Sequence, residues 1–141
     1  MRLFAPVLAC ALLASAAALA AEADVKTEMK QVVDPATNTL FAVGGEVDPA
    51  NGPDAAKVPA ARWAEALAAA RKLKGPAAHL TAAEYKAKGP VWTTSAADFA
   101  RLAAAAEAAA QKKDGAALSK AANDLGDTCT ACHTKFKPQT G

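Results

Sequence analysis

The sequence is poor in the residues that usually build a protein core or a reactive site. Aromatic residues make up 5% of its 141 residues, and it has three cysteines, two histidines and two methionines. So few cysteines exclude a disulfide-rich scaffold, and a formal net charge of +2 gives no basic footprint for nucleic acid. Because alanine-rich helices bury little apolar area, we expect a second source of apolar burial.

Long apolar runs are also absent, except at the N-terminus. Arg2 is followed by LFAPVLACALLASAAALA, which has small residues at Ala18 and Ala20. This pattern is typical of a cleaved secretory signal peptide, so we predict a signal over residues 1–20 and one domain over 21–141, without a stable membrane anchor. A transmembrane anchor is the alternative, because the run approaches the length of a span. Cleavage leaves only the last two cysteines.

Apolar residues elsewhere recur at spacings of three and four, which predicts helices, and no strand pattern competes. Pro35 should kink the first helix near 31–34, and the Gly- and Pro-rich stretch after it should be irregular. Short connections between such helices favour an all-α, antiparallel four-helix bundle. The expected helices span 24–43 (ended by Gly44 and Gly45), 59–73 (ended by Gly75 and Pro76), 95–111 (opened by a Ser95–Asp98 cap) and 115–137, with a short one near 81–88.

The last expected helix carries the most specific motif, CTACH at residues 129–133. Positions i, i+3 and i+4 share a helix face, so Cys129, Cys132 and His133 point the same way. In this arrangement each thiol can add across one haem vinyl group while the imidazole reaches the iron, and C-x-x-C-H is the signal for such attachment. Export supports this interpretation, because c-type haem is attached outside the bacterial cytoplasm.

Other interpretations of the motif fit less well. A zinc site needs about four ligands, and His79 is the only other histidine. A C-x-x-C redox motif usually stands at a helix start in a βαβ unit, whereas this pair comes late in a helix of an all-α chain. An alanine-rich helical interaction domain without haem is the alternative from another functional class. The sequence shows no catalytic constellation, so we do not expect an enzyme.

The chain resembles the class II cytochromes c, the cytochrome c′ family, over nearly all of residues 21–141. Three features carry the resemblance: the helix from Met29 to Gly45, Trp63 on the second helix, and CTACHTKF, whose aromatic residue follows the histidine by three positions. It implies one haem c per chain attached through Cys129 and Cys132, with His133 as proximal ligand and Lys137 as the nearby basic residue. Pocket-lining residues would be Val33, Phe99, Leu102 and Phe136.

The resemblance leaves the sixth ligand of the iron open. Low-spin relatives use a first-helix methionine, and the position of Met29 in EMKQ…GGE resembles that of this ligand. High-spin relatives block the iron with an apolar residue, and Val33 falls at that place. His79 is a further candidate, and Met29 could simply fill space in the core.

Function follows from this choice of ligand. The implied function is a periplasmic electron carrier working with redox proteins of unknown identity, and the alternative is a five-coordinate cytochrome c′ that binds NO or CO. The resemblance leaves a homodimer open.

Overall fold

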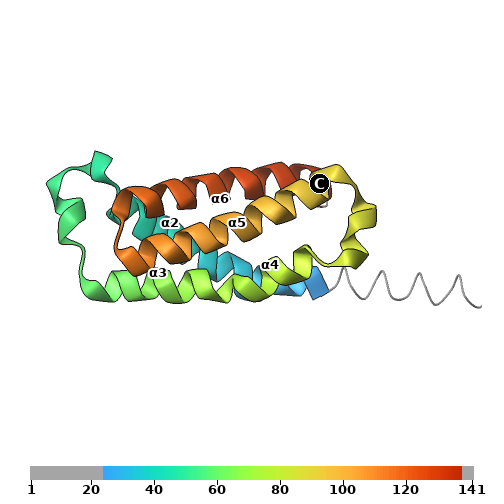
Figure 1. The fold of residues 1–141 in the computed structure, drawn as a ribbon, viewed down its shortest axis with the longest axis horizontal. Helices are drawn as coiled ribbons and strands as arrows, with labels where there is room; N and C mark the ends of the chain where they lie inside the picture. The colour runs from blue at the N-terminus through green and yellow to red at the C-terminus, as the bar shows by residue number, and fades with distance from the viewer. Residues whose placement is uncertain (1–23, 138–141) are drawn as a thin grey trace, which may run out of the picture.

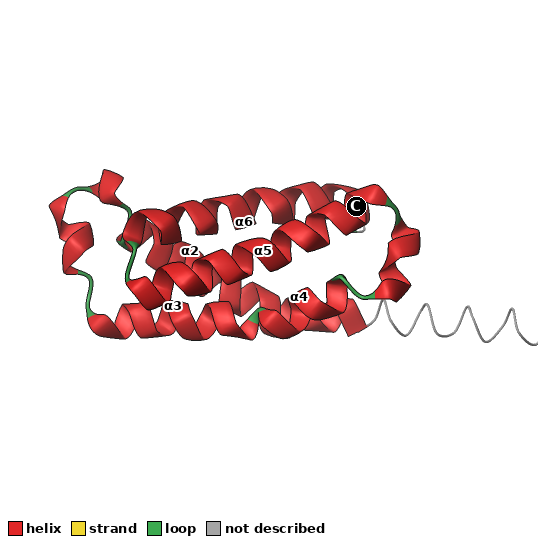
Figure 2. Ribbon diagram, in the orientation of Figure 1, coloured by secondary structure: helices red, strands yellow, loops and turns green. Residues whose placement is uncertain are grey.

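The computed structural model describes residues 24–137. The expected signal peptide, at 1–20, lies outside these residues. Within the described range the chain is helical and contains no strand, as Figures 1 and 2 show. No helix in this range is long and apolar enough to cross a membrane. The expected all-α class is therefore confirmed.

Within the described range, the chain is helical from residue 24 to residue 136 with only short interruptions. Residues 24–28 are α-helical and lead into a π-helix, η1. The elements that follow are η1 (Met29–Val33), α2 (Asp34–Glu46), the 3₁₀ helices η2 (Pro49–Asn51) and η3 (Pro53–Lys57), α3 (Ala60–Lys72), α4 (Lys74–Leu80), the 3₁₀ helix η4 (Ala83–Lys88), α5 (Pro90–Lys112) and α6 (Gly115–Phe136).

The long helices lie side by side along the long axis of the molecule (Figure 1). Helix α2 packs against α3 and α6, and α5 packs against α3, α4 and α6. Nearly half of the buried residues in the core between them are alanines, and their small side chains let the helices approach closely. The largest fully buried side chains are leucines and valines: Leu40, Val43, Val47, Leu73, Leu118 and Leu125.

Two glycines bring α2 and α6 into close contact. A Cβ built on Gly44 would lie 2.9 Å from the Cβ of Ala122, and one on Gly115 would collide with the carbonyl oxygen of Val47. The C-terminal end of α2 therefore lies against the N-terminal end of α6, so these two helices are antiparallel. We call residues 24–33, which precede α2, the first segment. The start of this segment and the end of α6 accordingly lie at the same end of the molecule (Figure 1).

The expected disturbance at Pro35 is present and takes the form of a π-turn. The N–H of Asp34 donates to the carbonyl of Met29, five residues earlier, which is the π-helical bond. Pro35 has no N–H to donate, and in an uninterrupted α-helix its ring would clash with the carbonyl of Gln31, four residues earlier, so the π-turn relieves a clash at this point. The hydroxyl of Thr37 donates to the carbonyl of Val33 at 2.8 Å, which provides that carbonyl with a partner.

Two expected helix boundaries are wrong, and one helix of the structure, α4, was not expected. Helix α2 continues through Gly44 and Gly45 to Glu46, since Gly44 serves the contact with α6. After α3 a second helix, α4, begins at once, and Pro76 lies in its first turn, where no N–H donor is needed.

The second boundary error concerns α5, which begins at Pro90 rather than at Ser95. Proline at a first helical position has its φ already near the helical value. Ser95 is consequently buried inside the helix and caps nothing. The stretch between α2 and α3, expected to be irregular, contains η2 and η3.

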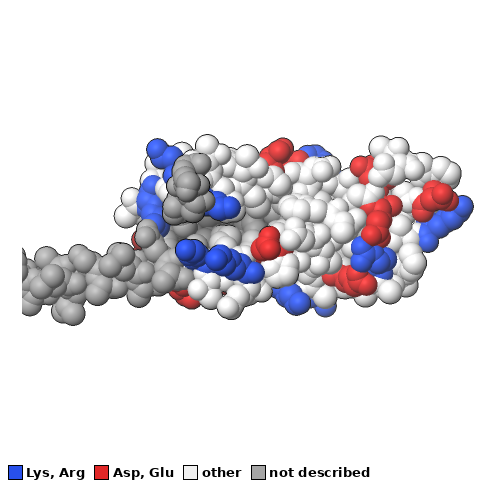
Figure 3. Space-filling view, turned by 180° about the vertical axis from the view of Figure 1, so that it is seen from behind, with Lys and Arg blue, Asp and Glu red and all other residues white. Residues whose placement is uncertain are grey.

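Ion pairs connect neighbouring helices at the surface. Glu107 of α5 accepts from Arg71 of α3 at 3.1 Å and from Lys74 of α4 at 2.7 Å, so it bridges the break between those two helices. These hydrogen bonds lower the pKa of the Glu107 carboxyl. Arg62 similarly joins Glu46 and Glu65. Basic and acidic side chains are interspersed over the face seen in Figure 3.

We expect Gly115→Ala to lower the free energy of unfolding by about 1–3 kcal/mol, because the new methyl group meets a backbone carbonyl that cannot move aside. Gly126→Ala is the matched control on the same helix, where a Cβ meets nothing within 4 Å, and it should raise stability by about 0.5–1 kcal/mol through helix propensity. Urea unfolding of both variants measures this, and equal effects would contradict the close contact.

Candidate functional site

Helix α6 presents the C-x-x-C-H residues in its last two turns. Asp114 caps the helix start by accepting from the N–H of Ala117 at 3.0 Å, and the helix ends at Phe136. Its inward stripe is as expected and becomes more exposed toward the C-terminal end. Leu118, Ala122 and Leu125 are buried, whereas Cys129, Cys132 and Phe136 are only partly buried.

Cys129 and Cys132 are free thiols. Burial raises the pKa of both, and that of Cys129 is raised further by the proximity of Cys132. Both groups therefore stay protonated at neutral pH. Neutral thiols on one helix face suit addition to a carbon–carbon double bond.

His133 is exposed on the turn that holds the two thiols. Desolvation lowers the pKa of its imidazole, and the positive charge of Lys137 lowers it further. The neutral ring is thereby favoured, and a neutral ring nitrogen has the lone pair that an iron ligand needs. The carbonyl of His133 accepts from the N–H of Lys137 at 3.0 Å, which completes the helix end.

An aromatic chain connects α6 to η4 and α4. The ring of Phe136 meets Trp92 edge-on at 5.2 Å between centroids, and Trp92 stacks on Tyr85 at 5.2 Å. Tyr85 meets His79 edge-on at 5.3 Å. The indole N–H of Trp92 donates to the carbonyl of Leu80 at 2.9 Å, so this ring is fixed in place.

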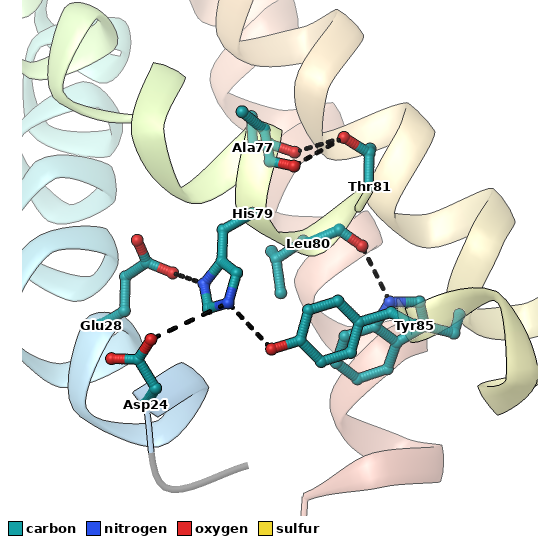
Figure 4. A network of polar contacts seen from close by, with 9 residues as sticks. Asp24, Glu28, Ala77, His79, Leu80, Thr81 and Tyr85 are labelled. Carbon is teal, nitrogen blue, oxygen red and sulfur yellow. Dashed lines mark hydrogen bonds and ion pairs between the residues drawn. The ribbon is translucent and has the colours of Figure 1, made fainter. Parts of the chain in front are cut away.

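His79 lies at the centre of a polar network seen in Figure 4. Its Nδ1 lies 2.8 Å from Oε2 of Glu28, and its Nε2 lies 2.9 Å from the hydroxyl oxygen of Tyr85. Asp24 lies 3.9 Å from the same Nε2. Because both ring nitrogens have partners, His79 is a poor candidate for an iron ligand in this arrangement.

Met29 is half-buried and packs against the main core cluster. The Gly44–Ala122 contact sets a common level for the two helices. At a rise of 1.5 Å per residue, Met29 lies about 20 Å from this level along the chain before Gly44, and Phe136 lies about 20 Å from it along α6. Met29 is thus level with the last turn of α6. The π-turn that begins at Met29 lies against α4.

The expected pocket residues belong to one apolar cluster. Val33, Phe99 and Leu102 are buried members of the core, and Phe136 packs against it together with Met29. Sequence reasoning missed Glu28, Tyr85 and Trp92, which join this region to the first segment. The only available signal was that Tyr85 is the sole tyrosine of the chain.

Two surface cavities of the described part of the chain are lined by none of the four expected pocket residues. One, of about 250 Å³, opens between α2 and α6 and is lined by residues such as Phe41, Gly44 and Asn123. The other, of about 560 Å³, opens between the first segment and α3 and is lined by residues such as Val32, Pro35 and Ala68. Neither cavity is lined by the cysteines or by His133.

The donor set fits a covalently held haem better than a bare metal ion. Within residues 24–137, no three His, Cys, Asp or Glu side chains gather as a metal ion would require. Two thioether bonds and one axial ligand need no such convergence, because they act on different atoms of a large macrocycle. Free thiols, a neutral imidazole and a thioether at one end of the molecule supply these functions.

Comparison with models of protein families, with curated proteins and with solved structures finds no match. Functional conclusions about the chain therefore depend on the chemistry of these residues.

In the haem-free chain we expect iodoacetamide to react more slowly with Cys129 and Cys132 than with an exposed cysteine at the same pH. Their raised pKa leaves less thiolate, so the rate should increase only as the pH rises above the ordinary thiol range. Unfolding in urea should restore the ordinary rate. A folded protein that reacts as fast as the unfolded chain would contradict the burial of the thiols.

Proposed function

We propose that this chain is a periplasmic monohaem cytochrome of the class II type, an electron carrier rather than an enzyme. The observation that carries the proposal is the placement of two free, half-buried thiols and a neutral imidazole in the last two turns of α6, at the end of the molecule where Met29 also lies. The signal-like start of the sequence supports export. Redox proteins of unknown identity would be its partners.

The fold supports this proposal through the pairing of its helices. We propose an antiparallel bundle of four members. The first member is the first segment together with α2, the second is α3 together with α4, and α5 and α6 are the third and fourth. Each member packs against two neighbours, so the four form a ring. In this arrangement α6 would hold the haem from one side. The first segment would close the other side, where the π-turn η1 lies against α4.

Each residue of the site would have a distinct task. Cys129 and Cys132 would hold the macrocycle through thioether bonds, and His133 would ligate the iron from the α6 side. The iron supplies the reversible one-electron change. Val33, Phe99, Leu102 and Phe136 would exclude water, and a low dielectric around the site tunes the reduction potential.

Met29 would be the second axial ligand, since it is the half-buried methionine at this end of the first segment. Histidine–methionine ligation raises the reduction potential and closes the iron to gases. The alternative, a five-coordinate iron that binds NO or CO, is favoured by Val33, which is buried one turn after Met29.

Covalent haem is the first test. The chain exported from a host that matures c-type cytochromes should retain haem through acid–acetone extraction and give a pyridine haemochrome spectrum with one haem per chain. Replacing both Cys129 and Cys132 with alanine should abolish this retention. Thr130→Ser, at the exposed position between them, is the control and should keep the haem. A wild-type chain without covalent haem would leave only the haem-free interaction domain.

Axial ligation is the second test. Met29→Ala should convert a low-spin ferric spectrum to high-spin and let the ferrous protein bind CO, while stability falls by only about 1–2 kcal/mol because the side chain is half-buried. Val25→Ala, on the same segment and also packed against the core, should leave the spectrum unchanged. A wild-type protein that is already high-spin and binds CO would support the gas-binding alternative.

A further inference from the structure

The first helical segment is held to α4 by a contact made by the neighbour of Met29. Glu28 bonds to His79 at 2.8 Å, and Asp24, one turn earlier, lies 3.9 Å from the same ring. The side chains of Glu28 and His79 are only 21% and 25% exposed. Because the contact is partly buried, breaking it without a replacement partner has a cost.

His79 is itself rigidly placed on its far side. Tyr85, which is 2% exposed, shares a hydrogen bond with His79 at 2.9 Å and meets its ring edge-on. Tyr85 in turn stacks on Trp92, whose indole is bonded to the backbone of Leu80. The imidazole is therefore held in one position, and the first segment is oriented by its contact with this ring (Figure 4).

The π-turn determines which residue of the first segment contacts His79. A π-turn contains one residue more than an α-turn, so it rotates everything before it by about 100° relative to α2. In a continuous α-helix the segment 24–28 would be turned by that amount, and Glu28 would no longer face His79. The Glu28–His79 contact and the π-turn before Pro35 therefore specify the same rotation.

We propose that His79 and Pro35 are positioning residues for Met29, and this inference rests on the proposed haem function. Pro35 imposes the π-turn, the π-turn brings Glu28 to His79, and the bonded Glu28 holds the next residue, Met29, toward the iron. Neither His79 nor Pro35 contacts the iron. Their role is to keep the thioether sulfur of Met29 close to the iron, so that it dissociates less often and external ligands replace it less readily.

The test uses the full-length exported holoprotein with His79→Ala, His79→Gln and Pro35→Ala. His79→Ala should raise the high-spin fraction of the ferric protein and increase the apparent affinity of the ferrous protein for CO by about tenfold, because a larger fraction of molecules has the methionine dissociated. His79→Gln, which keeps a donor and an acceptor, should restore most of the low-spin spectrum. Pro35→Ala should lose low-spin character although its helix propensity is higher.

Two controls separate positioning from general destabilisation. Asp98→Asn breaks an exposed ion pair with Arg101 on α5, and it should leave the spectrum unchanged. In a Met29→Ala background, His79→Ala should cause no further spectral change, since no ligand remains to be positioned. Without haem, amide exchange of residues 24–33 should be about tenfold faster in His79→Ala than in wild type, because local opening becomes easier.

The outcomes distinguish this inference from the proposed function. A low-spin wild-type protein whose spectrum and amide exchange are unaffected by His79→Ala and Pro35→Ala overturns the positioning role but leaves the electron-carrier proposal intact. A wild-type protein with covalent haem that is high-spin also overturns the inference and supports the gas-binding alternative. Failure to attach haem overturns both proposals.

Discussion

The arrangement of the site depends on the close contact between α2 and α6. Gly44 lies so near Ala122 that a single added methyl group would meet it at 2.9 Å, and Gly115 lies directly against the backbone of Val47. These contacts determine both the spacing and the register of two helices that carry opposite sides of the proposed haem site. Because the register is set at one end, the level of Met29 relative to Cys132 and His133 at the other end follows from helix geometry.

The two ends of the structure serve different purposes as a result. At the Gly44 end the helices are held together by small residues, and apolar contact is continuous. At the other end, the first segment contacts α4 through the Glu28–His79 bond. Larger aromatic residues pack beside α6 at this end. Tyr85, Trp92 and Phe136 form this aromatic group, which would border the proposed haem.

The sequence predicted what depends on local pattern. The 3–4 spacing of Leu118, Ala122 and Leu125 located the inward face of α6, and the C-x-x-C-H residues are adjacent in the chain. Helix α4, which contains Pro76, and the start of α5 at Pro90 were missed because the sequence alone does not show whether a proline ends one helix or begins the next. The Glu28–His79 contact joins residues 51 positions apart, and no periodicity predicts it. Pro35 indicated where the first helix is disturbed, but the π-turn and its rotation required the structure.

The contact between α2 and α6 also bears on the order in which the chain folds. Helices α5 and α6 are joined by a tight turn in which Lys113 has a left-handed backbone conformation, so their pairing closes a short loop. Gly44 and Ala122 are far apart in sequence, and their contact must overcome a much larger loop-closure entropy. We therefore expect the α5–α6 hairpin to form while the first segment is still detached. During that interval Cys129, Cys132 and His133 would be displayed on a formed helix with nothing across from them, which is the state in which a maturation enzyme could reach both thiols.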